Sequence, residues 1–381
     1  MRGKVLDICT GELSDFNGKH NFEPWGSLMV VEDNTKNIEF PEKDITIIKP
    51  QTEYLIAGEV ENALTLDKCD YYFDGVLQEK EGYVLNISTR ANSLGHKVQI
   101  HQDYHVNFNY IPDKLYLVCE TPWVFDIKVN DVKVEYSDCG YFRDISFRKI
   151  DISKYVKLGG NTISFDCDFE QSKKVYENLE KSYVFESEKN KLYFDMEIES
   201  IYLVGDFAVA TPGKWEKLGI VDGYENVKSF DNTFAYRYSG EFVIEKPVEK
   251  VNIKDIQKQG FPFFAGALNL VGDIEIKGSH PVLELDVYGV NSVHVKVDGK
   301  EFVAMTDNRI PLTGIAEGVH KIELTIINNL RNLLGPHHLE GGESLSVNPA
   351  AFYDEDSVFS KRSNPVIKKF NPNYCFVEMK I

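Results

Sequence analysis

The sequence has few of the features that mark several large classes of protein. Its six cysteines form no C-x-x-C pair and show no metal-ligand spacing, so neither a disulfide framework nor a zinc site is indicated. No apolar run approaches the length of a membrane span, and the first residues lack the apolar stretch of a secretion signal. We therefore expect a cytoplasmic protein whose cysteines are mostly buried free thiols.

Basic residues are scarce relative to acidic ones. The 381 residues include 60 Asp and Glu against 42 Lys and Arg, which gives a formal net charge of −18. Such a charge repels polyanions, and no run of Lys or Arg offsets it. Nucleic acid and anionic membrane are therefore poor candidates as partners, whereas neutral ligands are compatible with the composition.

The motifs of common enzyme classes are missing as well. The sequence has no G-x-S-x-G, no phosphate-binding glycine loop and no H-E-x-x-H. A carboxylate pair for glycoside hydrolysis stays open, because any two of the 60 acids could lie at the required separation. Asp206 follows an apolar segment, but a turn-ordering role explains it more simply.

What the sequence does contain is a duplication. Ile-Lys-Val-Asn at 127–130 returns as Val-Lys-Val-Asp at 295–298, and each follows a Leu-x-Leu strand. Similar closing strands come after them, at 159–165 and 318–324. A repeat of this length is too long for a solenoid and suits two copies of one domain.

The pattern within each copy predicts strands. Short alternating runs rich in Val, Ile, Tyr and Phe are separated by Asn, Asp and Gly, which is typical of antiparallel β-sandwiches. Asp298 and Gly299 suit a two-residue hairpin turn, and Asn130 and Asp131 fill the same place in the first copy. One short amphipathic helix is predicted over 170–183.

These patterns predict an all-β chain of tandem antiparallel β-sandwiches with one short helix. We expect residues 1–58 to be a β segment, the tail of a preceding domain. The first sandwich is predicted at 59–198 and the second at 199–381.

Two segments of the second copy have no counterpart in the first, and both are candidates for a sugar site. They are Gly-Phe-Pro-Phe-Phe-Ala-Gly at 260–266 and the polar stretch 328–343. Aromatic faces stack on sugar rings, while Asn, Arg, His and carboxylates bond sugar hydroxyls. The candidate carbohydrate-binding residues are Trp215, Phe261, Phe263, Phe264, Arg331, Asn332, His337, His338 and Glu343.

Each candidate also has a structural explanation. Phenylalanines fill cores more often than they form stacking platforms. Arg331 and Asn332 could hold a loop through backbone carbonyls. Adjacent side chains in an extended segment point to opposite faces, so His337 and His338 are not expected to share a metal ion.

The tryptophans differ in their sequence neighbours. Trp123 lies in an apolar run and is expected in the core. Trp215, between Lys214 and Glu216, is the predicted exposed platform.

Several segments resemble one known family. They are 62–69, 200–207, 260–266 and, most specifically, Asn-Leu-Arg-Asn-Leu-Leu-Gly-Pro-His-His at 329–338. They resemble the C-terminal region of bacterial α-L-rhamnosidase-like glycoside hydrolases. The β-sandwich modules of that region are similar to the sugar-binding domain of family 2 glycoside hydrolases and to galactose-binding jelly rolls. The resemblance runs from about Trp25 to the C-terminus.

This resemblance implies jelly-roll sandwiches separated from a catalytic (β/α)₈ barrel. In such proteins the catalytic acid and base lie on an upstream barrel, and no strand and helix alternation here could build one. No catalytic residue carries over, and the barrel is expected as a separate domain or subunit, unless the gene product is truncated. No cofactor is expected; calcium, common in jelly rolls, stays open without a loop signature.

Three functional hypotheses follow. The first is a non-catalytic module that binds a neutral oligosaccharide or glycoside, or serves as a scaffold for a separate catalytic barrel. The second is a self-sufficient glycosidase with an Asp/Glu pair, and the third is a structural protein-interaction module, which a large exposed apolar patch would favour. We expect any sugar site in the second copy, because the first shows little that could hold a ligand.

Overall fold

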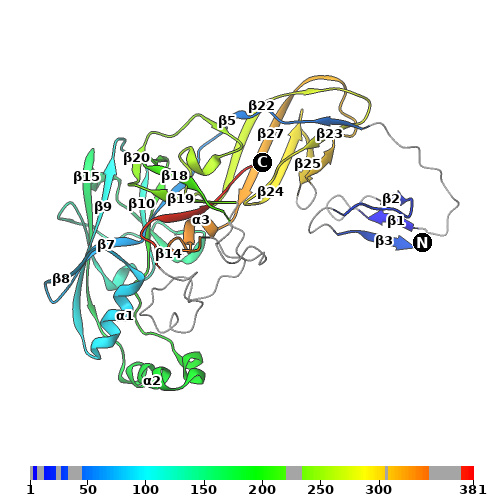
Figure 1. Ribbon diagram of the computed structural model, residues 1–381. Coiled ribbons are helices and arrows are strands. Elements are labelled where there is room, and N and C mark those ends of the chain that lie inside the picture. Colours follow the sequence, from blue (N-terminus) through cyan, green and yellow to red (C-terminus); the bar gives the residue numbers. More distant parts are fainter. Residues whose placement is uncertain are drawn as a thin grey trace.

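The computed structural model describes residues 3–6, 13–22, 27–32, 45–219, 234–304, 308–342 and 370–381. Most regular structure in these ranges is β-strand, which confirms the all-β prediction (Figure 1). The described ranges also contain helices α1 (Leu85–Leu94), α2 (Lys173–Val184) and α3 (Arg331–Leu334). The predicted helix over 170–183 corresponds to α2, whereas α1 and α3 were not predicted. Within the described part of the chain, no helix combines the length and apolar character needed to span a membrane.

The first sandwich consists of two sheets around one core. One sheet has the order β13 (Tyr141–Phe142), β14 (Asp144–Asp151), β10 (Leu115–Cys119), β16 (Ile201–Gly205) and β6 (Asn62–Leu66). The other runs β12 (Val132–Lys133), β11 (Asp126–Val129), β15 (Gly159–Phe169), β9 (Val98–Phe108), β20 (Val243–Glu245) and β17 (Ala208–Ala210). Strand β7 (Lys68–Phe73) pairs with β9 and with β8 (Val76–Tyr83). Burial along β9 alternates residue by residue, as a strand with one face on the core requires.

The second sandwich is built in the same way around its own core. Its larger sheet has the order β21 (Lys250–Asn252), β5 (Glu53–Ile56), β22 (Ala267–Ile276), β27 (Gly318–Asn328), β24 (Val290–Val297) and β25 (Lys300–Ala304). The smaller one is β26 (Arg309–Pro311), β23 (Pro281–Glu284) and β4 (Thr46–Ile48).

The duplication read from the sequence is present in the sheets. The strand order β12-β11-β15-β9-β7 of the first sandwich matches β25-β24-β27-β22-β5 of the second. The two predicted hairpins also match, with positive φ at Asn130 (51°) and Asp131 (64°) and at Asp298 (48°) and Gly299 (82°). Positive φ at both central residues is the type I′ geometry that suits the twist of paired strands.

The sheets do not follow the predicted domain boundaries. Strands β4 and β5 lie in the segment predicted as the tail of a preceding domain, yet they pair with β23 and β22 of the second sandwich. Strand β16, assigned to the second sandwich by the predicted boundary, pairs with β10 and β6 of the first. The first sandwich is therefore inserted between strands of the second.

Two smaller sheets complete the described structure. Strands β2 (Leu13–Phe16), β1 (Gly3–Leu6) and β3 (Met29–Glu32) form one, in that order. Strands β18 (Lys214–Lys217), β19 (Ala235–Ser239) and β28 (Tyr374–Val377) form the other.

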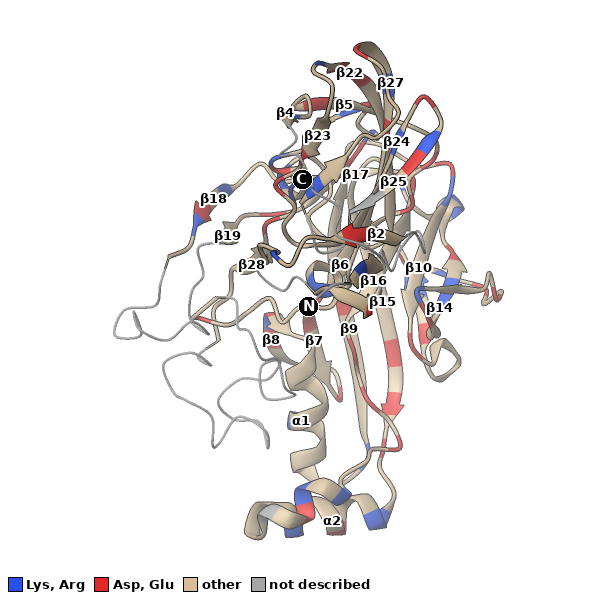
Figure 2. Ribbon diagram, turned by 90° about the vertical axis from the view of Figure 1, so that its right-hand side faces the viewer, with Lys and Arg blue, Asp and Glu red and all other residues tan. Residues whose placement is uncertain are grey.

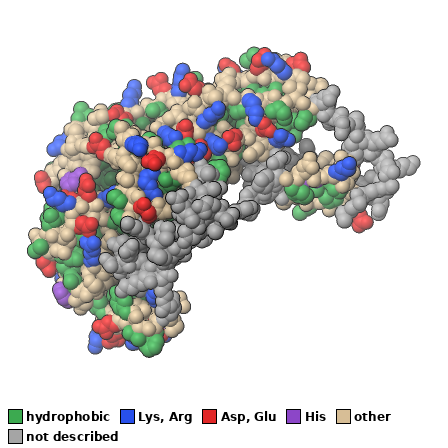
Figure 3. All heavy atoms as spheres, in the orientation of Figure 1, with side chains coloured by type: hydrophobic (Ala, Val, Ile, Leu, Met, Phe, Trp, Pro, Cys, Tyr) green, Lys and Arg blue, Asp and Glu red, His purple; other side chains and the backbone are tan. Residues whose placement is uncertain are grey.

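The surface mixes charges of both signs. The ribbon of Figure 2 shows acidic and basic residues interspersed along the strands, and in Figure 3 no basic patch gathers on the face shown. Of the described cysteines, Cys69, Cys119, Cys167 and Cys375 are buried free thiols, as predicted, and Cys139 is an exposed one.

Two segments join the cores of the two sandwiches. In the 260–266 segment, Phe263 enters the first core, while Phe261 and Phe264 enter the second. The C-terminal segment does the same, since Phe376 lies in the first core and Ile381 in the second. Together these segments form what we call the seam between the sandwiches.

A buried carboxylate anchors the seam. Asp67, between β6 and β7, accepts a hydrogen bond of 2.6 Å from the Tyr374 hydroxyl and one of 3.1 Å from His338 Nε2. His337 Nδ1 lies 3.5 Å from the same carboxylate. His338 Nδ1 also lies 2.8 Å from the Asn371 carbonyl oxygen. All four ring and carboxylate side chains of this Asp67 cluster are buried.

Burial and pairing act oppositely on the pKa values in this cluster. Burial alone would raise the pKa of Asp67, but His338 and His337 hold it well below its usual value of 3.8. Burial lowers the pKa of His337 below 6.5, against the opposing effect of Asp67. Asp67 is therefore the charged centre of a dry polar cluster.

Replacing Asp67 should destabilise the whole chain. Asp67→Asn replaces a buried carboxylate that accepts from Tyr374 and His338 with a neutral amide, so the free energy of unfolding should fall by about 3 kcal/mol. Urea denaturation at pH 7 measures this change. The control Asp168→Asn weakens only exposed interactions, chiefly the pair with Lys97, and should change the value by less than about 1 kcal/mol. Equal effects of the two variants would contradict a stabilising role for the Asp67 cluster.

The same cluster predicts a pH dependence. Because the pKa of His337 is lower in the folded chain than the unfolded value near 6.5, its contribution to stability is complete above about pH 6.5 and is lost as the pH falls through the folded pKa. The stability of the native chain minus that of His337→Gln should therefore be largest above about pH 6.5 and shrink as the pH falls below it. Urea titrations at several pH values give this difference, and a difference that stays constant would sink the prediction.

Candidate functional site

The segments predicted to bind sugar lie in the seam. The side chains of Phe261, Phe263 and Phe264 are at most 3% exposed, so they have no free face for a sugar ring. Their core role, the alternative drawn from the sequence, is the one the structure supports. The prediction that these three rings stack on a sugar is wrong, because the rings are buried.

The polar part of the second predicted segment is also engaged internally. His337 and His338 are buried and both reach Asp67, so the expectation that they face opposite ways is wrong. The Asn332 side chain exchanges two hydrogen bonds of 2.9 Å with the Val377 backbone, and Arg331 donates to the Pro336 carbonyl at 2.9 Å. Asn332 thus holds the C-terminal strand β28, and Arg331 holds the loop after α3. Glu343 lies outside the described residues.

The predictions for the two tryptophans are reversed. Trp215 is half-buried, with its ring 4.9 Å from that of Tyr238 and 5.5 Å from that of Phe376. Its indole N–H donates to Thr211 at 3.1 Å. Trp123, expected in the core, is instead 64% exposed.

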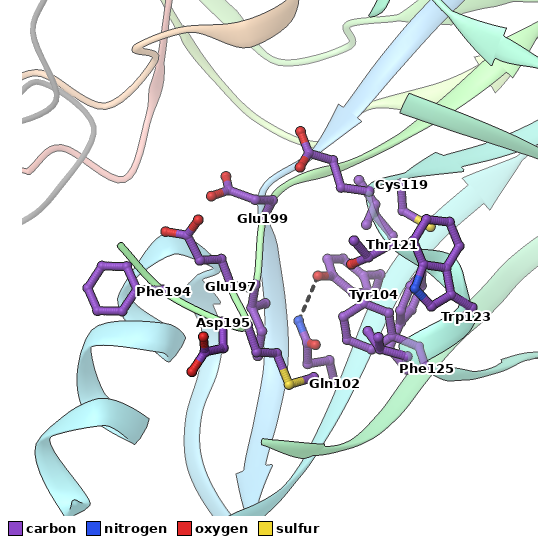
Figure 4. Close-up of a pocket in the computed structure, with 16 residues that line it drawn as sticks. Gln102, Tyr104, Cys119, Thr121, Trp123, Phe125, Phe194, Asp195, Glu197 and Glu199 are labelled. Atoms are coloured by element: carbon purple, nitrogen blue, oxygen red, sulfur yellow. Dashed lines mark hydrogen bonds between the residues drawn. The ribbon is translucent and has the colours of Figure 1, made fainter. Parts of the chain in front are cut away.

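Trp123 lies on the wall of a pocket in the first sandwich. The pocket has a volume of about 300 Å³ and is shown in Figure 4. The turn after β10 provides one side, and the extended segment 194–199 before β16 provides the other. Aromatic rings from the core form its inner surface, namely Tyr104, Phe125 and Phe165.

A strained turn places Trp123 outside the core. Thr121 has a φ of 44°, which is costly for a β-branched residue, and Pro122 then begins a 3₁₀ turn over Pro122–Val124. The Val124 N–H donates to the Thr121 carbonyl at 3.0 Å and closes this turn. Behind it, the ring of Phe125 packs 5.2 Å from Phe165. The indole is thus displayed by a turn anchored in the core.

Three glutamates surround the same pocket. Glu197 and Glu199 are two residues apart on the segment that leads into β16. Figure 4 shows both of them across the pocket from Trp123. Glu120 directly follows β10, and Glu199 lies two positions before the first residue of β16. Strands β10 and β16 pair with each other. The pairing of β10 with β16 therefore brings the three carboxylates to one end of the sandwich.

The environment raises the pKa of all three carboxyl groups. Burial, followed by the charges of Glu197 and Glu120, raises the pKa of Glu199 to about 8. Burial and Glu120 raise the pKa of Glu197, and burial and Asp144 raise that of Glu120. Carboxyl groups that share a partly dry site oppose one another's ionisation. At neutral pH the Glu199 carboxyl is therefore largely protonated.

A second cavity, of about 670 Å³, lies beside the Asp67 cluster. The polar groups on its wall are largely engaged with one another or with the backbone. Lys68 bonds the Pro372 carbonyl, and Asn107 donates to Glu241 at 3.1 Å. The pocket at Trp123 combines an exposed ring with perturbed carboxyl groups, and we take it as the candidate site.

The sequence carried one signal for this pocket that its interpretation missed. In the alignment of the two copies, Thr121 corresponds to Gly289, which also has a positive φ, of 71°. A β-branched residue at a position where the other copy has glycine indicates a strained turn.

The pocket lies in the first copy, which the sequence interpretation expected to hold little that could bind a ligand.

Comparisons with known proteins were made for the whole sequence and for the fold. No family model matches the chain, and no curated protein matches it. Similar solved structures include a β-D-mannosidase from Dictyoglomus thermophilum, with 12% identity and a TM-score of 0.24 over 70% of this chain and 31% of that one. An α-L-rhamnosidase from Streptomyces avermitilis, complexed with L-rhamnose, has 10% identity and a TM-score of 0.24 over 72% of this chain and 25% of that one.

A β-galacturonidase from Eisenbergiella tayi, bound to galacturonate, is similar to the same degree, with 9% identity and a TM-score of 0.24 over 74% of this chain and 39% of that one. The chain thus spans well under half the length of these three structures. Matches of this size assign the chain to no family, although these neighbours are all glycoside hydrolases.

Proposed function

We propose that the chain binds carbohydrate in the pocket beside Trp123. The observation that carries this proposal is an indole 64% exposed on the wall of a cavity of about 300 Å³. An exposed indole offers a flat apolar face, which suits the C–H face of a sugar ring. This pocket lies in the first copy, whereas the sequence predicted a sugar site in the second copy.

The polar groups of the pocket suit hydroxyl ligands. Ionised carboxylates accept hydrogen bonds strongly, and the protonated Glu199 can also donate one. On the inner surface of the pocket, the Gln102 amide donates a hydrogen bond of 2.8 Å to the Tyr104 hydroxyl, which fixes the positions of both polar groups. The volume lies at the lower end of the range for small-molecule sites.

The sugar-binding proposal can be tested through the two tryptophans. Trp123→Ala should raise the dissociation constant for a bound sugar about tenfold or more, because the stacking face is lost. The control Trp215→Phe alters the aromatic cluster that Trp215 forms with Tyr238 and Phe376. None of these residues lines the pocket, so the dissociation constant should stay unchanged. Calorimetric titration with rhamnose, galactose and plant oligosaccharides measures both variants. Absence of heat with every sugar at millimolar concentration would reject carbohydrate binding at this pocket and leave only a scaffold role.

A second candidate function is glycoside hydrolysis by the chain itself, and the raised pKa of Glu199 favours it. A protonated carboxyl beside an ionised one is the arrangement that glycosidases use, in which the acid protonates the leaving oxygen. Glu199 would be the general acid, and Glu197 the nucleophile or base.

Hydrolysis predicts a dependence on Glu199 and on pH. With aryl-glycosides, Glu199→Gln should lower kcat about 100-fold or more, since general acid catalysis is lost. Activity of the native chain should fall as the pH rises through about 8, where Glu199 loses its proton. The control Glu323→Gln changes an exposed residue of β27 and should retain full activity. Inertness of the native chain across a broad panel would eliminate this candidate but not sugar binding.

Under the binding proposal, catalysis belongs to a partner. The described strands form sandwiches, and no strand and helix alternation among them builds a (β/α)₈ barrel. A separate catalytic barrel, beside which this chain would hold or orient the glycan, is therefore the partner that the proposal includes.

A further inference from the structure

The pocket at Trp123 is one-sided in its charge. Its acidic wall consists of Glu120, Asp195, Glu197 and Glu199. No Lys, Arg or His is among the residues that line it in the described part of the chain. A neutral ligand in this pocket could donate hydrogen bonds to the carboxylates but would supply no counter-charge, and burying an uncompensated charge is costly.

We propose that the preferred ligand is an amino sugar with a free amine, whose ammonium group lies among Glu120, Glu197 and Glu199 while the sugar ring stacks on Trp123. This inference rests on the proposed carbohydrate site and names its ligand class. It differs from the neutral oligosaccharide expected from the sequence.

Mutual repulsion among the carboxyl groups is the first argument. The charges of Glu197 and Glu120 both oppose ionisation of Glu199, and Glu120 opposes that of Glu197. An ammonium group between them would favour ionisation of Glu199 and Glu197 instead, because an opposite charge within a few ångströms stabilises the ionised carboxylate. The pocket thus gains more from a cation than from a neutral hydroxyl.

A metal ion does not fit the same place. No group of three or more His, Cys, Asp or Glu among the described residues is close enough to hold one. The three glutamates would therefore act on a cation mainly through their combined negative charge, and an ammonium group would hydrogen-bond only to those carboxylates that it reaches directly.

The exposed indole is the second and independent argument. The face of Trp is the strongest aromatic partner for a cation and is also a platform for a sugar ring. At 64% exposure the Trp123 ring is available to stack on the sugar ring, while the ammonium group faces the carboxylates across the pocket. An amino sugar combines an apolar ring face with an ammonium group on one small molecule.

Three tetrasaccharides of the same linkage separate the alternatives. They are the β-1,4 tetramers of glucosamine, of N-acetylglucosamine and of glucose, titrated calorimetrically into the full chain at pH 7. The glucosamine tetramer should bind at least about tenfold tighter than the other two, since acetylation removes the charge. Equal affinity for all three would overturn the amine preference and leave sugar binding intact. Binding of none would reject both.

Matched variants exclude a non-specific attraction to the acidic chain. The double variant Glu197→Gln with Glu199→Gln keeps the shape of the pocket and should lose the preference for the amine. Glu323→Gln removes one exposed charge elsewhere and should keep it. A preference that survives in the double variant would overturn the proposal. Circular dichroism and the thermal midpoint establish that each variant is folded.

Proton exchange provides a readout that is independent of affinity. At pH 7 the Glu199 carboxyl is largely protonated, and an adjacent ammonium group should displace that proton. Titrations in phosphate and in Tris, which differ in ionisation enthalpy, give the net number of protons exchanged with the glucosamine tetramer. The sugar amine takes up protons in every variant, so the native chain should release more protons, or take up fewer, than Glu199→Gln. Equal proton exchange by the two proteins would count against the ammonium lying beside Glu199.

Discussion

The structure depends on the buried carboxylate of Asp67 and on the donors that it holds in place. Tyr374 and His338 reach it from β28 and from the segment after α3, which are far from it in the sequence. A charge buried to this extent is tolerated only when it is fully paired, so the C-terminal strand must adopt one position. The C-terminal residues 370–381, which include that strand, contribute side chains to both hydrophobic cores.

The sequence predicted the repeated unit well because the signals for it are local. Alternating burial and two-residue turns can be read within a few positions, and the matching strand orders of the two sandwiches confirm the duplication. The insertion of one sandwich into the other was not predictable in this way. It is set by the pairing of β5 with β22, whose residues are more than two hundred positions apart, and no local pattern specifies such a partner.

The most distinctive strings of the sequence proved to be structural. The 260–266 segment and the run ending in His337 and His338 are unusual because each must fit two surroundings at once. The Asn328 side chain, for example, donates to the Phe264 carbonyl at 2.6 Å and ties the two strings together. The residues of the candidate pocket are ordinary by comparison and come from separate stretches of the chain, so composition and spacing did not single them out.

The two copies differ in what covers the same corner of the sandwich. In the second copy, Tyr288 and Lys380 form a β-bridge, and a Cβ on Gly289 would lie 1.8 Å from the Glu378 carbonyl oxygen. The chain's own C-terminus therefore covers this corner, and only glycine fits beneath it. In the first copy, Thr121 occupies the corresponding position, and the neighbouring Trp123 is exposed at the wall of a cavity. A corner that one copy closes with its own backbone is thus open in the other, which is where a ligand can take the place of the covering strand.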